Sequence, residues 1–249
     1  MVSGIGRLEM LSFWEKVMQP AVAGLILAGN NMDHVVDGIL KFKRDVFPDH
    51  RELFGELATG QSPEVLLVTC ADSRIDPNLV TQTKPGDLFI CRNAGNIVPP
   101  HVSQAGGVTA SIEYAVAVLG VEHIVVCGHT DCGAMKGALA TEALTDLPHV
   151  KEWLDHARSA VEVVRARHGH CGPEHLDELT RENVLQQIQH LRTHPVVAAR
   201  VRAGTLQLHG WIYDIETGEV SCYEEETDQF MPIAERYERL AARQAAASA

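Results

Sequence analysis

The chain has 249 residues, of which 45% are apolar and 22% are charged. This composition is typical of a globular protein and excludes a mainly disordered chain. Lys and Arg total 21 against 33 Asp and Glu, so the formal net charge is −12. A chain this acidic repels phosphate backbones, which argues against nucleic-acid binding through a broad basic surface. Six cysteines are too few for a disulfide scaffold of this length.

The first 31 residues differ from the rest of the chain. They are rich in Gly and Ala, and the longest apolar run near the start, 21–28, is too short to span a bilayer. No basic start precedes an apolar segment of the secretory kind. We therefore expect a cytoplasmic protein with no membrane partner. The segment 1–31 is an arm that packs on a partner, a loose tail, or sequence upstream of a true start at Met32, and the sequence leaves these three possibilities open.

From residue 32 onward, helical patterns alternate with patterns of buried strands. The stretch 32–47 repeats apolar residues at helical spacing. Short apolar runs typical of strands buried on both faces occur at 65–69, 88–91 and 124–127, and a more amphipathic strand is expected at 206–213. Residues 220–223 are expected to pair with that last strand through a turn at 217–218. The other expected helices span 107–119, 150–167, 173–192 and 229–243.

This alternation predicts an α/β fold with a mainly parallel central β-sheet flanked by helices. No internal repeat or break in composition marks a second domain. We therefore expect a single domain over residues 32–243. The Ala-rich tail, 244–249, is expected to fray.

Two polar segments follow strand ends. Residues 70–74, with the sequence CADSR, come directly after the strand at 65–69, and residues 129–133, HTDCG, follow the strand at 124–127. In a doubly wound sheet, the carboxyl ends of neighbouring parallel strands face one crevice, where ligands bind. We expect the two segments to meet there.

Cys70, His129 and Cys132 form a donor set that suits zinc. The His-x-x-Cys spacing lets two ligands from one loop reach a single ion. Neither segment offers the fourth Cys or His that closes a structural site, and three protein ligands with an open position are the catalytic pattern. We therefore expect one catalytic zinc per chain. By contrast, Cys91 and Cys127 lie inside apolar strands and fit the role of small buried side chains.

Asp72 and Arg74 are two residues apart, so their side chains can point the same way and pair through two hydrogen bonds. Such a pair beside a zinc ligand can accept a hydrogen bond from zinc-bound hydroxide and orient it. An ordinary surface ion pair has the same spacing, and the sequence alone does not separate the two. The Asp72 carboxylate is also a displaceable candidate for the fourth zinc position in a closed state of the site.

A stretch between two expected helices holds further potential metal ligands: His168, His170, Cys171 and His175. Two glycines and a proline interrupt this stretch. We expect a solvated loop here rather than a second metal site.

The chain resembles the β-class carbonic anhydrases at the motifs just described. The Cys-x-Asp-x-Arg motif of that family appears at 70–74, and its His-x-x-Cys-Gly motif appears at 129–133. Residues 92–96, RNAGN, are also typical of the family. The likeness runs from about residue 33 to about residue 230.

The resemblance implies the fold of that family, with zinc held by Cys70, His129 and Cys132 and with Asp72 and Arg74 as the catalytic dyad. It also implies a substrate pocket at a dimer interface, to which the partner contributes some residues. The implied pocket residues are Gln61, Phe89, Tyr114 and Gly133. Known members are dimers or larger, so a homodimer at least is expected.

The implied reaction is the reversible hydration of carbon dioxide to bicarbonate and a proton, through attack by zinc-bound hydroxide. A carbonyl sulfide or carbon disulfide hydrolase would share the fold and the ligands, and Gln61 favours carbon dioxide. A non-catalytic, zinc-stabilised bicarbonate sensor is a third possibility, which the presence of Asp72 and Arg74 disfavours. Leu67 stands where one subgroup carries the Trp of a regulatory bicarbonate site, which argues against that site here.

Overall fold

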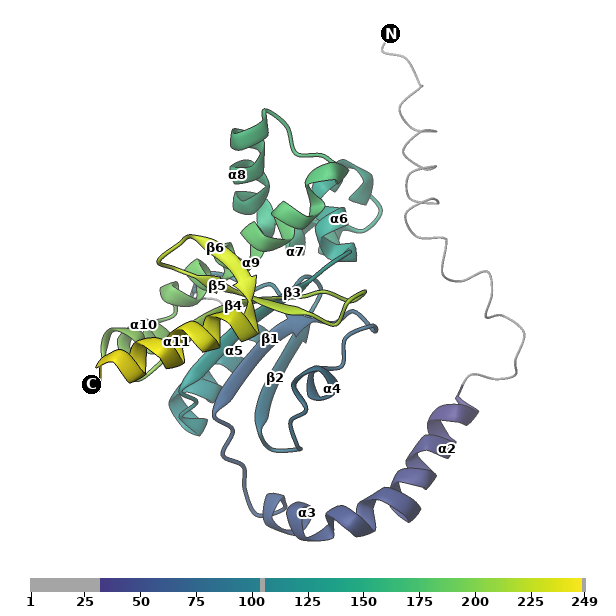
Figure 1. The fold of residues 1–249 in the computed structure, drawn as a ribbon. Coiled ribbons are helices and arrows are strands. Elements are labelled where there is room, and N and C mark those ends of the chain that lie inside the picture. Colours follow the sequence, from purple (N-terminus) through teal and green to yellow (C-terminus); the bar gives the residue numbers. More distant parts are fainter. Residues whose placement is uncertain (1–31, 104–105, 248–249) are drawn as a thin grey trace. The chain divides into compact units, whose positions relative to one another are not determined.

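A computed structural model describes residues 32–103 and 106–247 of the chain (Figure 1). The expected arm or tail at 1–31 lies outside these residues, as do positions 104–105 and 248–249. The chain divides into two compact units, one ending at Gly60 and the other beginning at Gln61.

The described part of the first unit is helical, as the apolar spacing predicts. Helix α2 (Asp33–Lys41) continues into a π-helical turn, η1 (Phe42–Val46), and a 3-10 turn, η2 (Phe47–His50), which lead to α3 (Arg51–Leu57). Three aromatic rings, of Phe42, Phe47 and Phe54, pack against one another with centroids 5.4 to 6.1 Å apart. This aromatic contact ties the successive turns together.

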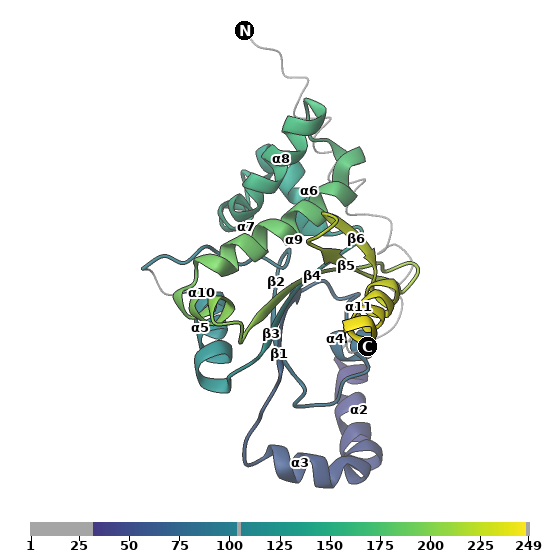
Figure 2. The ribbon, with the colours of Figure 1, turned by 60° about the vertical axis from the view of Figure 1, so that its left-hand side comes forward.

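The second unit is built on a six-stranded sheet in the order β2-β1-β3-β4-β5-β6 (Figure 2). The pairs β1–β2, β1–β3 and β3–β4 are parallel, and the pairs β4–β5 and β5–β6 are antiparallel. The strands are β1 (Val65–Cys70), β2 (Leu88–Asn93), β3 (His123–His129), β4 (Gln207–Tyr213), β5 (Val220–Glu224) and β6 (Gln229–Pro232). The mainly parallel sheet and the expected hairpin of β4 and β5 are therefore confirmed.

Helices connect and flank these strands. They are α4 (Pro77–Thr81), α5 (Gly107–Glu113), α6 (Gly133–Leu139), α7 (Pro148–Leu154), α8 (Arg158–His168), α9 (Leu176–Thr193), α10 (Pro195–Arg202) and α11 (Ile233–Ala247). Shorter helical turns are η3 (Tyr114–Leu119), η4 (Thr141–Leu144), η5 (Asp155–Ala157) and η6 (Pro173–His175). None of the helices described here is long and apolar enough to cross a bilayer.

Two expected helices have different bounds in the structure. The helix expected at 229–243 begins only at Ile233, because Gln229–Pro232 forms the edge strand β6 and pairs with β5. A proline is tolerated on such an edge, where its missing N–H breaks no ladder bond. The helix expected at 150–167 is divided by the 3-10 turn η5. Helix α11 continues to Ala247.

Helix α9 covers one face of the sheet with a row of buried side chains. Val184, Ile188 and Leu191 belong to the same apolar cluster as the inner residues of β1 and β3. Two strand glycines permit this close approach: a Cβ on Gly128 would lie 2.9 Å from Val184, and one on Gly210 would lie 3.0 Å from Ile188. The helix therefore lies directly against β3 and β4, and its polar side chains reach the carboxyl ends of the strands.

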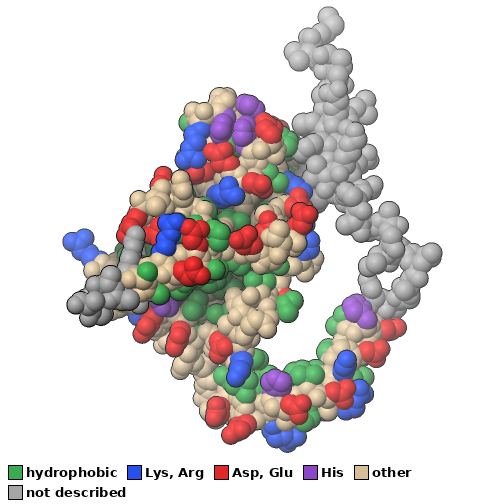
Figure 3. All heavy atoms as spheres, viewed as in Figure 1, with side chains coloured by type: hydrophobic (Ala, Val, Ile, Leu, Met, Phe, Trp, Pro, Cys, Tyr) green, Lys and Arg blue, Asp and Glu red, His purple; other side chains and the backbone are tan. Residues whose placement is uncertain are grey.

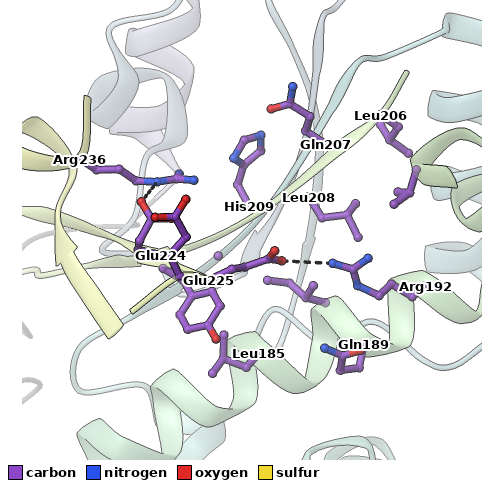
Figure 4. A pocket seen from close by; sticks show the side chains of 15 residues that line it. Leu185, Gln189, Arg192, Leu206, Gln207, Leu208, His209, Glu224, Glu225 and Arg236 are labelled. Atoms are coloured by element: carbon purple, nitrogen blue, oxygen red, sulfur yellow. Dashed lines mark hydrogen bonds and ion pairs between the residues drawn. The ribbon is translucent and has the colours of Figure 1, made fainter. Parts of the chain in front are cut away.

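The opposite face of the sheet carries a smaller apolar cluster of Leu67, Val125 and Cys127. Two hollows of about 270 and 540 Å³ open on this face, beside residues of α4 and α11. Apolar side chains gather next to α11 in Figure 3. A third hollow, of about 740 Å³, lies between α9 and β4–β5 (Figure 4). Its arginines already pair with carboxylates, Arg192 with Glu225 and Arg236 with Glu224.

Candidate metal centre

The carboxyl ends of β1 and β3 bring three potential metal ligands together. Cys70 ends β1, His129 ends the neighbouring parallel strand β3, and Cys132 immediately precedes α6. The two sulfur atoms are 4.0 Å apart, and the three donor atoms all lie within 4.8 Å of one another. All three side chains are buried.

The geometry of this cluster fits zinc. Two thiolates of a tetrahedral zinc site, each about 2.3 Å from the metal, lie about 3.8 Å from each other. The Nδ1 atom of His129 is 2.8 Å from the carbonyl oxygen of Thr130, so Nδ1 carries the proton and donates it. The lone pair is thereby left on Nε2, which is buried and has no hydrogen-bond partner among the described residues. A buried, unsatisfied nitrogen is costly, and a metal ion would satisfy it.

A hydrogen bond joins the two cysteine sulfurs. The hydrogen bond from Cys132 lowers the pKa of Cys70 to about 4, and the Gly95 N–H, 3.3 Å from the Cys70 sulfur, helps to lower it. The same bond to Cys70, together with burial, raises the pKa of Cys132. Two buried thiolates side by side need a nearby positive charge, which a divalent ion supplies.

Asp72 and Arg74 pair beside this cluster. Arg74 donates from Nε to Oδ1 at 2.9 Å and from Nη2 to Oδ2 at 2.8 Å, and its backbone N–H reaches Oδ1 at 3.0 Å. These bonds lower the pKa of Asp72 to about 2. Oδ2 of Asp72 is 3.8 Å from Nε2 of His129. In this conformation the carboxylate is turned toward Arg74 and lies beside the three donors.

Arg74 is itself fixed by a second carboxylate that the sequence analysis did not single out. Its Nη1 donates to Oδ2 of Asp131 at 2.9 Å, and Lys136 of α6 pairs with the other oxygen of Asp131. Opposite charges therefore alternate along the four side chains from Asp72 to Lys136. The position of Asp131 inside the motif at 129–133 was a signal that could have identified it.

A buried polar chain from α9 supports the loop after β2. The loop bends at Gly95, whose φ of +83° and 3.0 Å approach to Ala134 exclude a side chain. Asn183 donates to the carbonyl of Gly95 at 3.0 Å, and Gln187 donates to Asn183 at 2.9 Å. Gln187 also accepts the N–H of Val98 at 2.9 Å. These contacts hold the Gly95 N–H against the Cys70 sulfur.

This pair of amides was not among the site residues expected from the sequence. Asn183 and Gln187 are four residues apart and fully buried on the apolar face of α9. Two polar side chains in an otherwise apolar stripe were the signal, since buried amides must find partners. Arg92 has a similar role from β2, because it donates to the carbonyls of Cys70 and Asp72 at 3.0 and 2.7 Å.

The expected pocket residues lie in several places. Gly133 is the first residue of α6, directly after Cys132. Phe89 and Tyr114 face each other with ring centroids 6.0 Å apart, and Tyr114 is 45% exposed. Phe89 is four residues before the end of β2 that pairs with Cys70, about 13 Å along the strand. Its side chain therefore does not reach the metal donors of its own chain. Gln61 is exposed.

Two buried cysteine sulfurs and a buried imidazole meet at the end of a parallel sheet, so the chain is an α/β protein with a donor set suited to zinc. A family model described as carbonic anhydrase matches residues 65–220. The carbonic anhydrase of Pseudomonas aeruginosa is 49% identical over 208 residues, which are 83% of this chain and 94% of that protein. That of Synechococcus elongatus is 49% identical over 191 residues, 76% of this chain and 70% of that protein.

Solved structures agree with these sequence matches. The β-carbonic anhydrase CcaA superposes with a TM-score of 0.79 at 43% identity, over 82% of this chain and 100% of that one. One of two tetrameric β-carbonic anhydrases of Sordaria macrospora superposes with a TM-score of 0.69 at 30% identity. The match covers 78% of this chain and 97% of that one. The chain belongs to the β-class carbonic anhydrases. It is an enzyme of that family, with the fold that the sequence analysis expected.

Replacing Asn183 by Ala removes the donor to Gly95 and frees the loop whose N–H reaches Cys70. We expect the affinity for zinc to fall about 10- to 100-fold, the usual effect of losing a group that orients a metal ligand. Zinc retained after dialysis against graded chelator concentrations measures the effect. Gln189→Ala, which changes an exposed amide on the same helix, is the control. Equal affinities in the two variants, with both folded by circular dichroism, would contradict this role for Asn183.

Proposed function

We propose that this chain catalyses the reversible hydration of carbon dioxide to bicarbonate and a proton at a zinc ion held by Cys70, His129 and Cys132. The proposal rests on the Nε2 of His129, which is buried beside two cysteine sulfurs, lies 3.8 Å from a carboxylate and has no hydrogen-bond partner in the described part of the chain. Zinc, when bound, supplies Lewis-acid chemistry that makes water nucleophilic near neutral pH.

The residues around the donors orient the attacking water. Because Arg74 keeps Asp72 ionised, this carboxylate is a hydrogen-bond acceptor only. It accepts a hydrogen bond from the attacking water and thereby turns a lone pair of that water toward the carbon atom. Arg74 fixes both carboxylate oxygens, and Asp131 prevents Arg74 from turning away. Asp72 and Arg74 thus act as the catalytic dyad, and the Gly133 N–H contacts the bicarbonate product.

A second protomer completes the pocket in this proposal. Phe89 and Tyr114 form one aromatic surface, which lies too far along β2 to reach the metal donors of the same chain. Tyr114 is exposed enough to meet another copy. We assign these two residues and Gln61 to the pocket of the partner. We also propose a cytoplasmic location, because each of the six cysteines is a free thiol, as in a reducing compartment.

Cys132→Ser tests the metal and the reaction together. We expect the variant to lose most of its zinc and nearly all carbon dioxide hydration, because a hydroxyl is a far weaker zinc ligand than a thiolate. Stopped-flow hydration assays with a pH indicator, paired with metal analysis before and after chelation, measure both. Cys91→Ser, in the middle of β2, is the control and should keep both. Unchanged zinc in Cys132→Ser would overturn the ligand assignment. Turnover of carbonyl sulfide without carbon dioxide hydration would overturn the substrate.

Asp72→Asn and Arg74→Ala test the dyad. Each should lower kcat/KM for hydration about 100-fold or more, since a misplaced acceptor no longer orients the water, and each should keep one zinc per chain. Arg165→Ala removes an exposed ion pair with Glu162 and controls for loss of surface charge. Activity within a few-fold of wild type in both dyad variants would remove Asp72 and Arg74 from the mechanism.

Subunit complementation tests the shared pocket. The metal-site variant Cys132→Ser and the pocket variant Tyr114→Ala are each expected to hydrate carbon dioxide poorly and to sediment as dimers or larger. In a mixed dimer, one site combines an intact metal centre with an intact partner Tyr114. Random mixing after co-refolding should therefore restore about a quarter of wild-type activity. An active monomer in sedimentation, or no gain on mixing two variants shown to form mixed dimers, would contradict the proposal.

A further inference from the structure

A second group of metal-ligating side chains lies at the turn between α8 and α9. Nε2 of His170 is 2.7 Å from Oε1 of Glu174, and that oxygen is 3.4 Å from Nδ1 of His175. The donor atoms of these three residues lie within 4.8 Å of one another. Figure 3 shows histidine and acidic side chains gathered over this end of α8. The turn is largely exposed, as expected for a solvated loop, and its three potential metal ligands lie close together.

The backbone of the turn produces this arrangement. Gly169 ends α8 in the left-handed region, with φ +78°, and bonds to the Arg165 carbonyl at 2.8 Å. The chain then turns back through Gly172, whose N–H is 3.3 Å from Nδ1 of His175. A Cβ on Gly172 would lie 2.6 Å from both carboxylate oxygens of Glu174. The missing side chain at Gly172 therefore makes room for the carboxylate between the two imidazoles.

The neighbours of the turn limit its freedom. The ring of His168 stacks on that of His175, with centroids 4.4 Å apart and planes 21° apart, and its Nε2 is 2.8 Å from Glu178 of α9. On the inner side, Cys171 and Leu176 pack against the apolar cluster that contains Cys70 and Cys132. The donors thus project from a turn that is anchored on both sides, which lowers the entropy lost when they bind an ion.

We propose that His170, Glu174 and His175 form a second metal site, for one late first-row divalent ion such as zinc. Two imidazoles and one carboxylate are a donor set that zinc accepts in proteins, with the remaining positions filled by water. Adjacent ligands of such an ion lie about 3 Å apart, close to the two separations that Glu174 makes with the histidines. Binding exchanges the His170–Glu174 hydrogen bond and the weak Gly172–His175 bond for metal bonds.

The site is expected to bind less tightly than the first centre, because it has no thiolate and is open to solvent. An ion there joins the end of α8 to the start of α9. Because an ion held by this site binds the folded chain and not the unfolded one, it is also expected to raise the melting temperature. The second site is independent of the reaction proposed above, since none of its ligands belongs to the first centre.

The test uses the full chain carrying one zinc, dialysed until only the tight site is filled. Zinc is titrated into this protein by calorimetry at about pH 8, where free imidazole is neutral, and the bound metal is counted. We expect one further ion per chain with micromolar affinity and a rise in Tm. His170→Ala and Glu174→Gln should weaken the second ion at least tenfold while keeping the first zinc and the hydration activity. His149→Ala, an exposed histidine on α7, should change neither.

Three results would overturn the site. The first is that the wild-type chain binds no second ion, and the second is that His149→Ala and His170→Ala weaken the binding of the second ion equally. The third is that the second ion persists in the His170→Ala/His175→Ala double variant. Loss of the second ion in Cys171→Ser would show that the thiol is a ligand, and the proposed donor set would then be wrong. Metal counting does not depend on catalysis, so these outcomes stay distinct from failure of the proposed reaction.

Discussion

The parallel pairing of β1 with β3 is the constraint on which the metal centre depends. The register places Thr69 opposite Cys127, so Cys70 and His129 leave the sheet at the same edge. Side chains alternate between the faces of a sheet, and a slip by one residue would turn Cys70 to the other face. The inner residues of both strands are fully buried against α9, and such a slip would expose them. The same packing energy that stabilises the fold therefore also positions two of the three proposed metal ligands.

Charge at this edge is balanced in two ways. The buried sulfurs and the Nε2 of His129, which has no hydrogen-bond partner among the described residues, form a cluster that a bound cation would neutralise. The Asp72 carboxylate beside it is already neutralised by its ion pair with Arg74. Because Asp131 and Lys136 continue the alternation of charge, moving Asp72 onto the metal would leave Arg74 with one carboxylate rather than two. The pairing favours a carboxylate that orients water over one that binds metal.

The parts of the site that were predictable from sequence are those in which the chemistry is local. Cys70, Asp72 and Arg74 lie within five consecutive positions that begin at the end of one strand, and His129 and Cys132 lie within four that begin at the end of another. Asn183 contacts Gly95 across 88 residues, so its role depended on how α9 docks. The residues of strand β6 were expected to be helical, because four residues are too few to show the alternation typical of a strand. Their conformation depends on pairing with β5. Residues 168–174 are largely exposed, as expected for a solvated loop, but the sequence did not show that the side chains of His170, Glu174 and His175 converge, because their spacing depends on the turn at Gly172.

The hydrogen bonds of Asn183 and Gln187 explain why α9 has these two polar side chains in an otherwise apolar interface. Burying an amide costs free energy unless its hydrogen bonds are made. Here Asn183 bonds to Gly95, Gln187 bonds to Val98, and the two amides bond to each other. Apolar substitutes would pack well against the sheet, yet they would leave a loop carbonyl and a loop N–H unsatisfied beside the ligands. In the folded chain, α9 contacts the Gly95 carbonyl while the Gly95 N–H lies 3.3 Å from the Cys70 sulfur. Metal binding at the proposed centre is therefore expected to stabilise the packing of α9 and the folded second unit.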